Sequence, residues 1–170
     1  MKPISKKARI AVNCSVNGAD CSHEVSTSRV LADFLRDDLG LKGTKVSCGR
    51  SVCGACTVLI DGAPRAACSA FVFEADGCEI ETVEGLEGKQ GVPNPLQQAF
   101  IRRSAFQCGF CTSGMLMLLW GLLRDNPNPD RAEILRWMSS NTCRCTGYSL
   151  IVEAVEEAVR EMNRSREAAQ

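Results

Sequence analysis

The sequence predicts an α+β protein, with a small β-sheet domain followed by an all-helical domain. Up to about residue 84, short runs of β-branched and apolar residues alternate with turn-forming pairs, as is typical of strands joined by hairpins. Beyond residue 94, apolar residues recur at the spacing of a helix face. The stretch between them is polar and rich in glycine, which indicates a linker. We therefore expect domains over residues 1–84 and 94–170, joined by a linker over 85–93.

The sheet domain should contain two hairpins and one further strand. Asn17-Gly18 and Asp61-Gly62 each separate two strand-like runs, and both pairs tolerate the positive φ of a tight turn. The expected strands, in chain order, are Ala8–Val16, Cys21–Val25, Thr57–Ile60, Pro64–Cys68 and Cys78–Val83.

One helix should cross this sheet. It should be capped within Ser26–Ser28, because serine is a favoured N-cap residue, and it should end at Gly40. Its apolar residues stand at helical spacing, at positions 30, 31, 34, 35 and 39.

The second domain should contain four helices. Their apolar residues recur along one face, and the expected spans are Leu96–Arg103, Gly114–Leu123, a helix capped by Asp130 and running to about Ser139, and Ile151–Met162. The polar residues from Asn163 onward are expected to be irregular.

Composition excludes several classes of function. Lys plus Arg and Asp plus Glu both number 20, and this balance argues against a nucleic-acid-binding protein. The single histidine argues against a His-based nucleophile triad and against a His-rich zinc site. The N-terminus shows no apolar signal segment, and the longest apolar run, Gly114–Leu123, is too short to span a bilayer. The sequence therefore predicts a cytoplasmic protein that does not associate with membranes.

Cysteine is the unusual residue, with 11 copies. An odd number of cysteines in a reducing compartment fits metal binding better than a disulfide framework. Cys48, Cys53 and Cys56 follow the C-x4-C-x2-C spacing of plant-type [2Fe–2S] ferredoxins, and Cys68 ends the hairpin that follows. A zinc site or a set of buried thiols is the alternative, but structural zinc usually takes paired C-x2-4-C knuckles.

A second quartet lies in the helical domain. Cys108 and Cys111 form a CxxC pair, and Cys143 and Cys145 form a CxC pair; each pair stands just before a helical pattern. The partial positive charge of a helix N-terminus favours thiolates there. Spacing alone leaves a second iron–sulfur cluster and a zinc site equally acceptable, with a redox dithiol as a weaker alternative.

Three segments resemble the iron–sulfur chain of the xanthine dehydrogenase / aldehyde oxidase family of molybdenum hydroxylases. They are TKVSCGRSVCGACTVLIDG, QCGFCTSGM and NTCRCTGYSLIVEAV, and the likeness runs from about Ile10 to Met162. It implies a ferredoxin-like (β-grasp) N-terminal domain and a four-helix C-terminal domain, each with one [2Fe–2S] cluster.

The resemblance also implies ligands for each cluster. Those of the first are Cys48, Cys53, Cys56 and Cys68, and those of the second are Cys108, Cys111, Cys143 and Cys145. In the family, the positions of Gln107 and Cys145 lie close to the molybdopterin. The family often has Gly at position 51 and Pro at position 113, where this chain has Ser51 and Ser113.

The implied role is electron relay. Electrons would pass from a molybdopterin on a large subunit, through the two clusters, to FAD on a medium subunit during substrate hydroxylation. This chain has no Gly-rich dinucleotide fingerprint, so we expect molybdopterin and FAD to be bound by separate partner chains in a hetero-oligomer. The sequence offers no set of general bases and no substrate-pocket signature, so we expect no catalytic residue here.

Two alternatives remain at this point. One is a free-standing two-cluster ferredoxin, and the other is an interaction module that is stabilised by structural zinc and has no redox role. Cys14, Cys21 and Cys78 fall outside both quartets, and we expect them to be small apolar residues in or beside strands.

Overall fold

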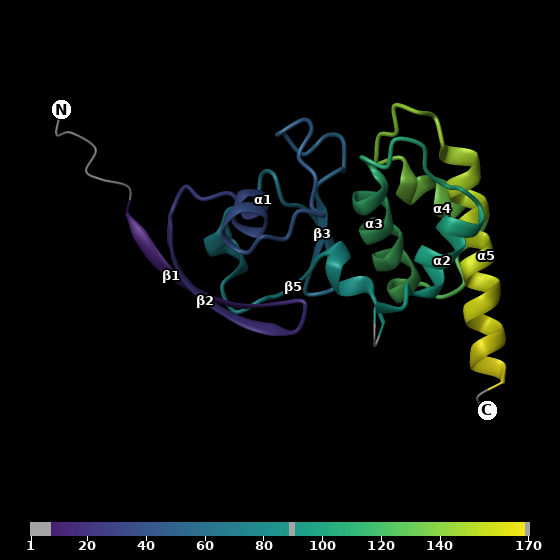
Figure 1. The fold of residues 1–170 in the computed structure, drawn as a ribbon, viewed down its shortest axis with the longest axis horizontal. Helices are drawn as coiled ribbons and strands as arrows, with labels where there is room; N and C mark the ends of the chain where they lie inside the picture. Colours follow the sequence, from purple (N-terminus) through teal and green to yellow (C-terminus); the bar gives the residue numbers. More distant parts are fainter. Residues whose placement is uncertain (1–7, 89–90, 169–170) are drawn as a thin grey trace.

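The computed structural model describes residues 8–88 and 91–168. A β-sheet part and a helical part lie side by side along the long axis of the molecule (Figure 1). Among the described residues, no helix is both long and apolar enough to cross a membrane.

A five-stranded mixed sheet forms the first part, in the order β2-β1-β5-β3-β4. Its strands are β1 (Arg9–Val16), β2 (Ala19–Ser26), β3 (Thr57–Ile60), β4 (Ala63–Ala66) and β5 (Glu79–Glu81). The β1–β5 pairing is parallel, and the other three pairings are antiparallel. Both expected turns are present, with positive φ at Asn17, Gly18, Asp61 and Gly62.

Two of the expected strands are shorter than predicted. The strand expected to reach Cys68 ends at Ala66, because the chain turns there and the Ser69 N–H donates to the Ala66 carbonyl at 3.2 Å. The strand expected from Cys78 begins at Glu79, because the Cys78 N–H donates to Ala75 in the preceding turn. Cys68 therefore lies on a turn, where its sulfur is free to face the cysteine loop.

The helix over the sheet differs in form from the prediction. It begins as α1 (Leu31–Asp33) and continues as the π-helical η1 (Phe34–Asp38). The cap expected within Ser26–Ser28 is wrong: Ser26 ends β2, and the N-cap is Val30. The chain leaves the helix through Gly40 at φ +74°, as predicted. Buried apolar side chains of this helix, Leu31, Phe34 and Leu35, pack into the sheet core.

Four helices form the second part: α2 (Pro95–Arg102), α3 (Thr112–Asp125), α4 (Arg131–Met138) and α5 (Tyr148–Glu167). The α2 N-cap, Asn94, accepts a hydrogen bond from the Gln97 N–H at 2.9 Å, and Asp130 caps α4 in the same way through the Glu133 N–H at 2.7 Å. The irregular end expected from Asn163 is wrong, because α5 continues to Glu167. There the Asn163 amide donates to Asn128, which anchors the last turns.

Helix α3 joins the two parts. Six of its buried residues belong to the helical core, and Leu59 of β3 belongs to that same core. A Cβ at Gly121 of α3 would lie 2.9 Å from Pro64 Cγ and 3.1 Å from Leu59 Cδ2, so the helix lies directly on the β3–β4 hairpin. An ion pair between Arg124 and Glu81 adds a polar contact across this boundary.

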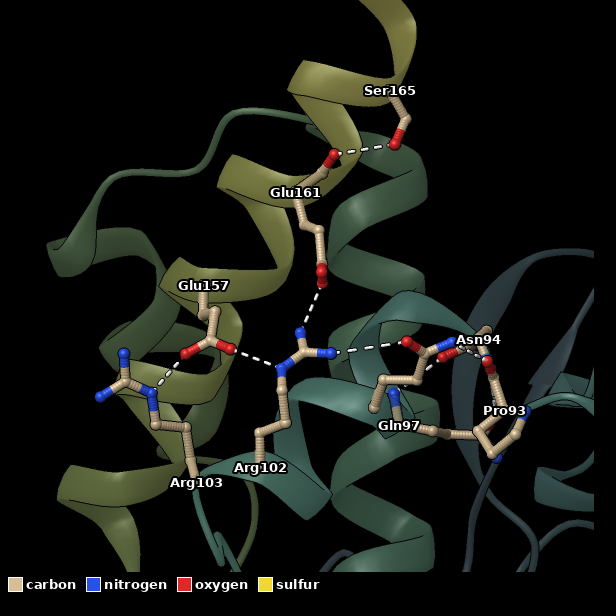
Figure 2. Close-up of polar contacts among 9 residues, drawn as sticks. Pro93, Asn94, Gln97, Arg102, Arg103, Glu157, Glu161 and Ser165 are labelled. Atoms are coloured by element: carbon tan, nitrogen blue, oxygen red, sulfur yellow. Dashed lines mark hydrogen bonds and ion pairs between the residues drawn. The ribbon is translucent and has the colours of Figure 1, made fainter.

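Helices α2 and α5 are held together by ion pairs at their surface (Figure 2). Glu157 of α5 pairs with both Arg102 and Arg103, and Glu161 pairs with Arg102. The two guanidinium groups lower the pKa of the Glu157 carboxyl below its ordinary value of 4.5. The charged form of Glu157 is thus the form that favours the folded state.

We predict that Glu157→Gln lowers the melting temperature at neutral pH and low salt. Because the pKa of Glu157 is lower in the folded state, its stabilising effect is present above the unfolded pKa and is lost as pH falls through the folded value. The difference between variant and parent should therefore shrink in acid and in high salt. Glu161→Gln, which loses contact with one arginine instead of two, should have a smaller effect in the same thermal unfolding measurements.

Candidate metal centres

The loop that carries Cys48, Cys53 and Cys56, called here the first cysteine loop, precedes β3 and wraps around its own sulfurs. Three of its residues have positive φ: Gly49 at +63°, Ser51 at +57° and Gly54 at +70°. This backbone form turns successive N–H groups toward one side. The N–H groups of Arg50 and Val52 donate to Cys48 Sγ at 3.5 and 3.4 Å. The loop is therefore built to stabilise negative charge on sulfur.

Amide groups also reach the other sulfurs of the first quartet. The Ser51 N–H donates to Cys68 Sγ at 3.4 Å, and the Cys68 N–H donates to Cys56 Sγ at 3.4 Å. The turn after β4 thus brings Cys68 to the loop, as the sequence predicted. All four cysteines of the first quartet lie together.

The thiols of this quartet differ in acidity. Hydrogen bonds from the backbone N–H groups of Arg50, Val52 and Cys53 lower the pKa of Cys48 to about 6. Burial raises the pKa of Cys56 to about 12. A thiolate at Cys56 therefore requires a compensating positive charge, which a bound metal provides.

The second quartet lies where two loops meet before α3 and α5. Cys111 is the N-cap of α3, and the sulfurs of Cys108 and Cys145 are 3.5 Å apart. Cys111 contacts Cys143, and burial raises the pKa of Cys111 to about 12. A hydrogen bond from the Phe110 N–H lowers the pKa of Cys108. The sequence predicts that each cysteine pair of this quartet stands just before a helix, and this is confirmed for Cys111.

Both quartets are arranged as two pairs of sulfurs. The contacting pairs are Cys48 with Cys53, Cys56 with Cys68, Cys108 with Cys145, and Cys111 with Cys143. Within residues 8–88 and 91–168, no three His, Cys, Asp or Glu side chains converge on one ion position. A [2Fe–2S] cluster takes two thiolates on each of two irons. The donor set fits two two-iron clusters.

The remaining three cysteines lie away from these loops. Cys14 and Cys21 are opposite one another in the β1–β2 ladder, and Cys78 directly precedes β5. All three pack in or against the core of the sheet part, where we expected small apolar residues. None of the 11 cysteines forms a disulfide.

The two cysteine sites are in direct contact through the backbone. The Thr142 N–H, next to Cys143, donates to the carbonyl of Cys53 at 2.9 Å. A Cβ at Gly114, near the start of α3, would lie 2.2 Å from the Gly54 carbonyl oxygen. The loops therefore approach as closely as a backbone without side chains allows.

Asn141 is a residue at this contact that sequence reasoning missed. Asn141 is 4% exposed. Its backbone carbonyl accepts a hydrogen bond from the Tyr148 hydroxyl. The same hydroxyl accepts a hydrogen bond from the Cys143 N–H at 2.7 Å. The Asn141 side chain fills the space where Gly54 would carry a Cβ. A polar residue beside a cysteine motif gives no sign in the sequence that it will be buried against a distant loop.

Gln107 and Cys145, the pair that the resemblance associates with a pterin, are brought together. The Gln107 side-chain amide donates to the Cys145 carbonyl at 3.0 Å. Gln107 and Cys108 are exposed, and the residues Phe106 and Phe110 on either side are 44% and 47% exposed. The second site thus reaches the surface within an apolar rim.

We predict that Gly54→Ala disrupts the contact between the cysteine loops, whereas Gly49→Ala does not. Both glycines have positive φ, so each alanine carries a backbone strain of about 1–2 kcal/mol. Only at Gly54 would the new Cβ collide, at 1.2 Å from Asn141 Oδ1 and 2.9 Å from the Ser140 carbonyl; at Gly49 it meets nothing within 4 Å. Thermal unfolding and hydrogen exchange around residues 139–145 should show a larger loss for Gly54→Ala. Equal losses in the two variants would contradict the tight contact.

Comparison with known proteins agrees with this geometry. Residues 40–92 match the family "2Fe-2S iron-sulfur cluster binding domain", and residues 82–156 match the family "[2Fe-2S] binding domain". The nicotine 6-hydroxylase small subunit of Paenarthrobacter nicotinovorans is 46% identical over 91% of this chain and 92% of its own length. The nicotinate dehydrogenase small FeS subunit of Eubacterium barkeri is 42% identical over 89% of this chain and 96% of its own.

A solved structure shows the same fold. Quinoline 2-oxidoreductase from Pseudomonas putida 86 matches with a TM-score of 0.86 and 46% identity, over 92% of this chain and 97% of the matched chain. The aldehyde oxidoreductase of Desulfovibrio gigas also matches with a TM-score of 0.86, but there this chain spans only 17% of the matched chain. The chain therefore belongs to the iron–sulfur small subunits of the xanthine dehydrogenase / aldehyde oxidase family of molybdenum hydroxylases, and it serves electron transfer through two [2Fe–2S] clusters.

Proposed function

We propose that each contacting pair of sulfurs holds one iron of a [2Fe–2S] cluster. Cys48 with Cys53 and Cys56 with Cys68 would hold the first cluster, and Cys108 with Cys145 and Cys111 with Cys143 the second. The two-by-two arrangement of the sulfurs carries this assignment. When bound, each cluster accepts and releases single electrons, while the surrounding N–H groups offset its negative charge.

We further propose that the chain relays electrons between two partner subunits. A large subunit with a molybdopterin would dock at the second site, and a medium subunit with FAD would lie toward the first. The exposed Cys108 within its apolar rim of Phe106 and Phe110 suits the first of these contacts, because desolvated apolar surface is typical of interface cores.

The contact between the loops suits passage from one cluster to the other. From Cys143 the covalent path runs one residue to Thr142, crosses one 2.9 Å hydrogen bond, and reaches Cys53 directly. The role of Thr142 is to keep this path short and fixed. No side chain in it needs to donate or accept a proton.

The names of the relatives support a complex of separate chains. They include a "small subunit", a "subunit beta" of a dehydrogenase complex and a "subunit gamma" of caffeine dehydrogenase. A free-standing two-cluster ferredoxin is therefore not favoured. We propose a cytoplasmic hetero-oligomer, and a division of this chain into domains over residues 1–84 and 94–170 with a linker over 85–93.

The first prediction from this proposal concerns metal content. The chain should bind two irons and two acid-labile sulfides per site, and the reduced protein should give two distinct EPR signals, because the two sites differ in fold and hydrogen bonding. Stoichiometric zinc without labile sulfide would contradict the assignment.

The second prediction separates ligands from other cysteines. Cys53→Ser or Cys56→Ser should remove or strongly disturb one EPR signal, because a hydroxyl is a poor replacement for a soft thiolate. Cys14→Ser, Cys21→Ser and Cys78→Ser are matched controls that should keep both signals. Loss of a signal in a control, with retention in a quartet variant, would show that the grouping is wrong.

The third prediction concerns Gln107. Gln107→Ala removes the amide that bonds the Cys145 carbonyl at the proposed pterin-facing surface. In the assembled complex, we expect weaker molybdenum retention or slower reduction of the second cluster by substrate, with the first cluster intact. Metal analysis and anaerobic stopped-flow measure the two effects, and unchanged values for both would remove the pterin contact from the proposal.

A further inference from the structure

The hydroxyl groups of Ser51 and Ser69 connect the two sides of the first cysteine site. They are hydrogen-bonded to each other although they lie 18 positions apart in the chain. Ser51 stands between Cys48 and Cys53, and Ser69 directly follows Cys68. The pair therefore joins the cysteine loop to the turn that supplies the fourth sulfur.

Ser69 is the fixed end of this pair. Its N–H and its hydroxyl both donate to the carbonyl of Ala66, the last residue of β4, at 3.2 and 3.3 Å. Because the single hydroxyl proton of Ser69 is used on that carbonyl, its oxygen is left to accept the Ser51 hydroxyl. The sheet thus anchors Ser69, and Ser69 anchors Ser51.

Ser51 is the strained end. Its φ of +57° lies in the left-handed region that disfavours residues with a Cβ. In that conformation its N–H donates to Cys68 Sγ at 3.4 Å. A loop residue held in an unfavourable backbone form needs a compensating contact, and the hydroxyl pair provides one.

We propose that the Ser51–Ser69 hydroxyl pair holds the Ser51 amide against the Cys68 sulfur and thereby raises the reduction potential of the first cluster. This inference rests on the proposed role of Cys68 as a ligand. Reduction adds negative charge to the cluster, and a hydrogen bond to a ligand sulfur stabilises that charge. Ser51 and Ser69 are thus positioning residues that favour electron transfer toward the first cluster.

The test is a redox titration of the full chain with both clusters, followed by EPR. Ser69→Ala removes the anchor and leaves residue 51 unchanged, and Ser51→Ala removes the hydroxyl while keeping the Cβ that disfavours the positive φ. Both should shift the potential of the first cluster downward and leave that of the second cluster unchanged. Ser28→Ala is the matched control, because it removes another exposed serine hydroxyl pair, Ser26 with Ser28 at 3.0 Å, and should leave both potentials unchanged.

An unchanged first potential in Ser69→Ala, or an equal shift of both clusters, would overturn the inference. If Ser69→Ala does not assemble the first cluster, the Ser51→Ala titration decides by the same criterion. Failure of the proposed function looks different: the parent chain would then lack two iron–sulfur signals, or Cys68→Ser would keep the first one.

Discussion

The close approach of the first cysteine loop to the start of α3 fixes the rest of the arrangement. There is no room for a side chain at Gly114, where a Cβ would meet the Gly54 carbonyl at 2.2 Å, and the Thr142 N–H bonds the Cys53 carbonyl alongside. Interiors packed this closely deform little. Two redox sites on separate modules therefore keep one constant separation, which a relay of single electrons requires.

Charge on sulfur is the second constraint. Each site brings four thiols together, and burial of Cys56 and Cys111 raises the pKa of each to about 12, so these two would stay protonated unless a metal is bound. The more accessible Cys48 is instead stabilised as thiolate by backbone N–H groups, with a pKa of about 6. In each site, the buried thiol, Cys56 or Cys111, needs a metal to become a thiolate. The more exposed thiol, Cys48 or Cys108, has its negative charge offset by backbone N–H groups.

Most of the fold was predictable from local chemistry. Turn pairs such as Asn17-Gly18 define the hairpins, and Asn94 and Asp130 act as the helix caps that their positions suggest. The errors lie where tertiary contacts decide. Helix α5 runs to Glu167, beyond its amphipathic stretch, because Asn163 bonds Asn128, and Arg102 and Arg103, which look like ordinary surface charges, join α2 to α5 through Glu157 (Figure 2).

The sequence by itself determined the cysteine quartets and the family, because ligand spacing and loop glycines are local properties of the chain. Spacing alone left the second quartet open between zinc and iron, since spacing carries no information on how four sulfurs divide in space, and the resemblance to the family is what favoured iron. Only the tertiary structure decided that division, by setting Cys108 against Cys145 and Cys111 against Cys143. The tertiary structure also decided that Asn141 packs against Gly54 and that Ser51 pairs with Ser69. Contacts between residues far apart in the chain exist only once the loops have packed together.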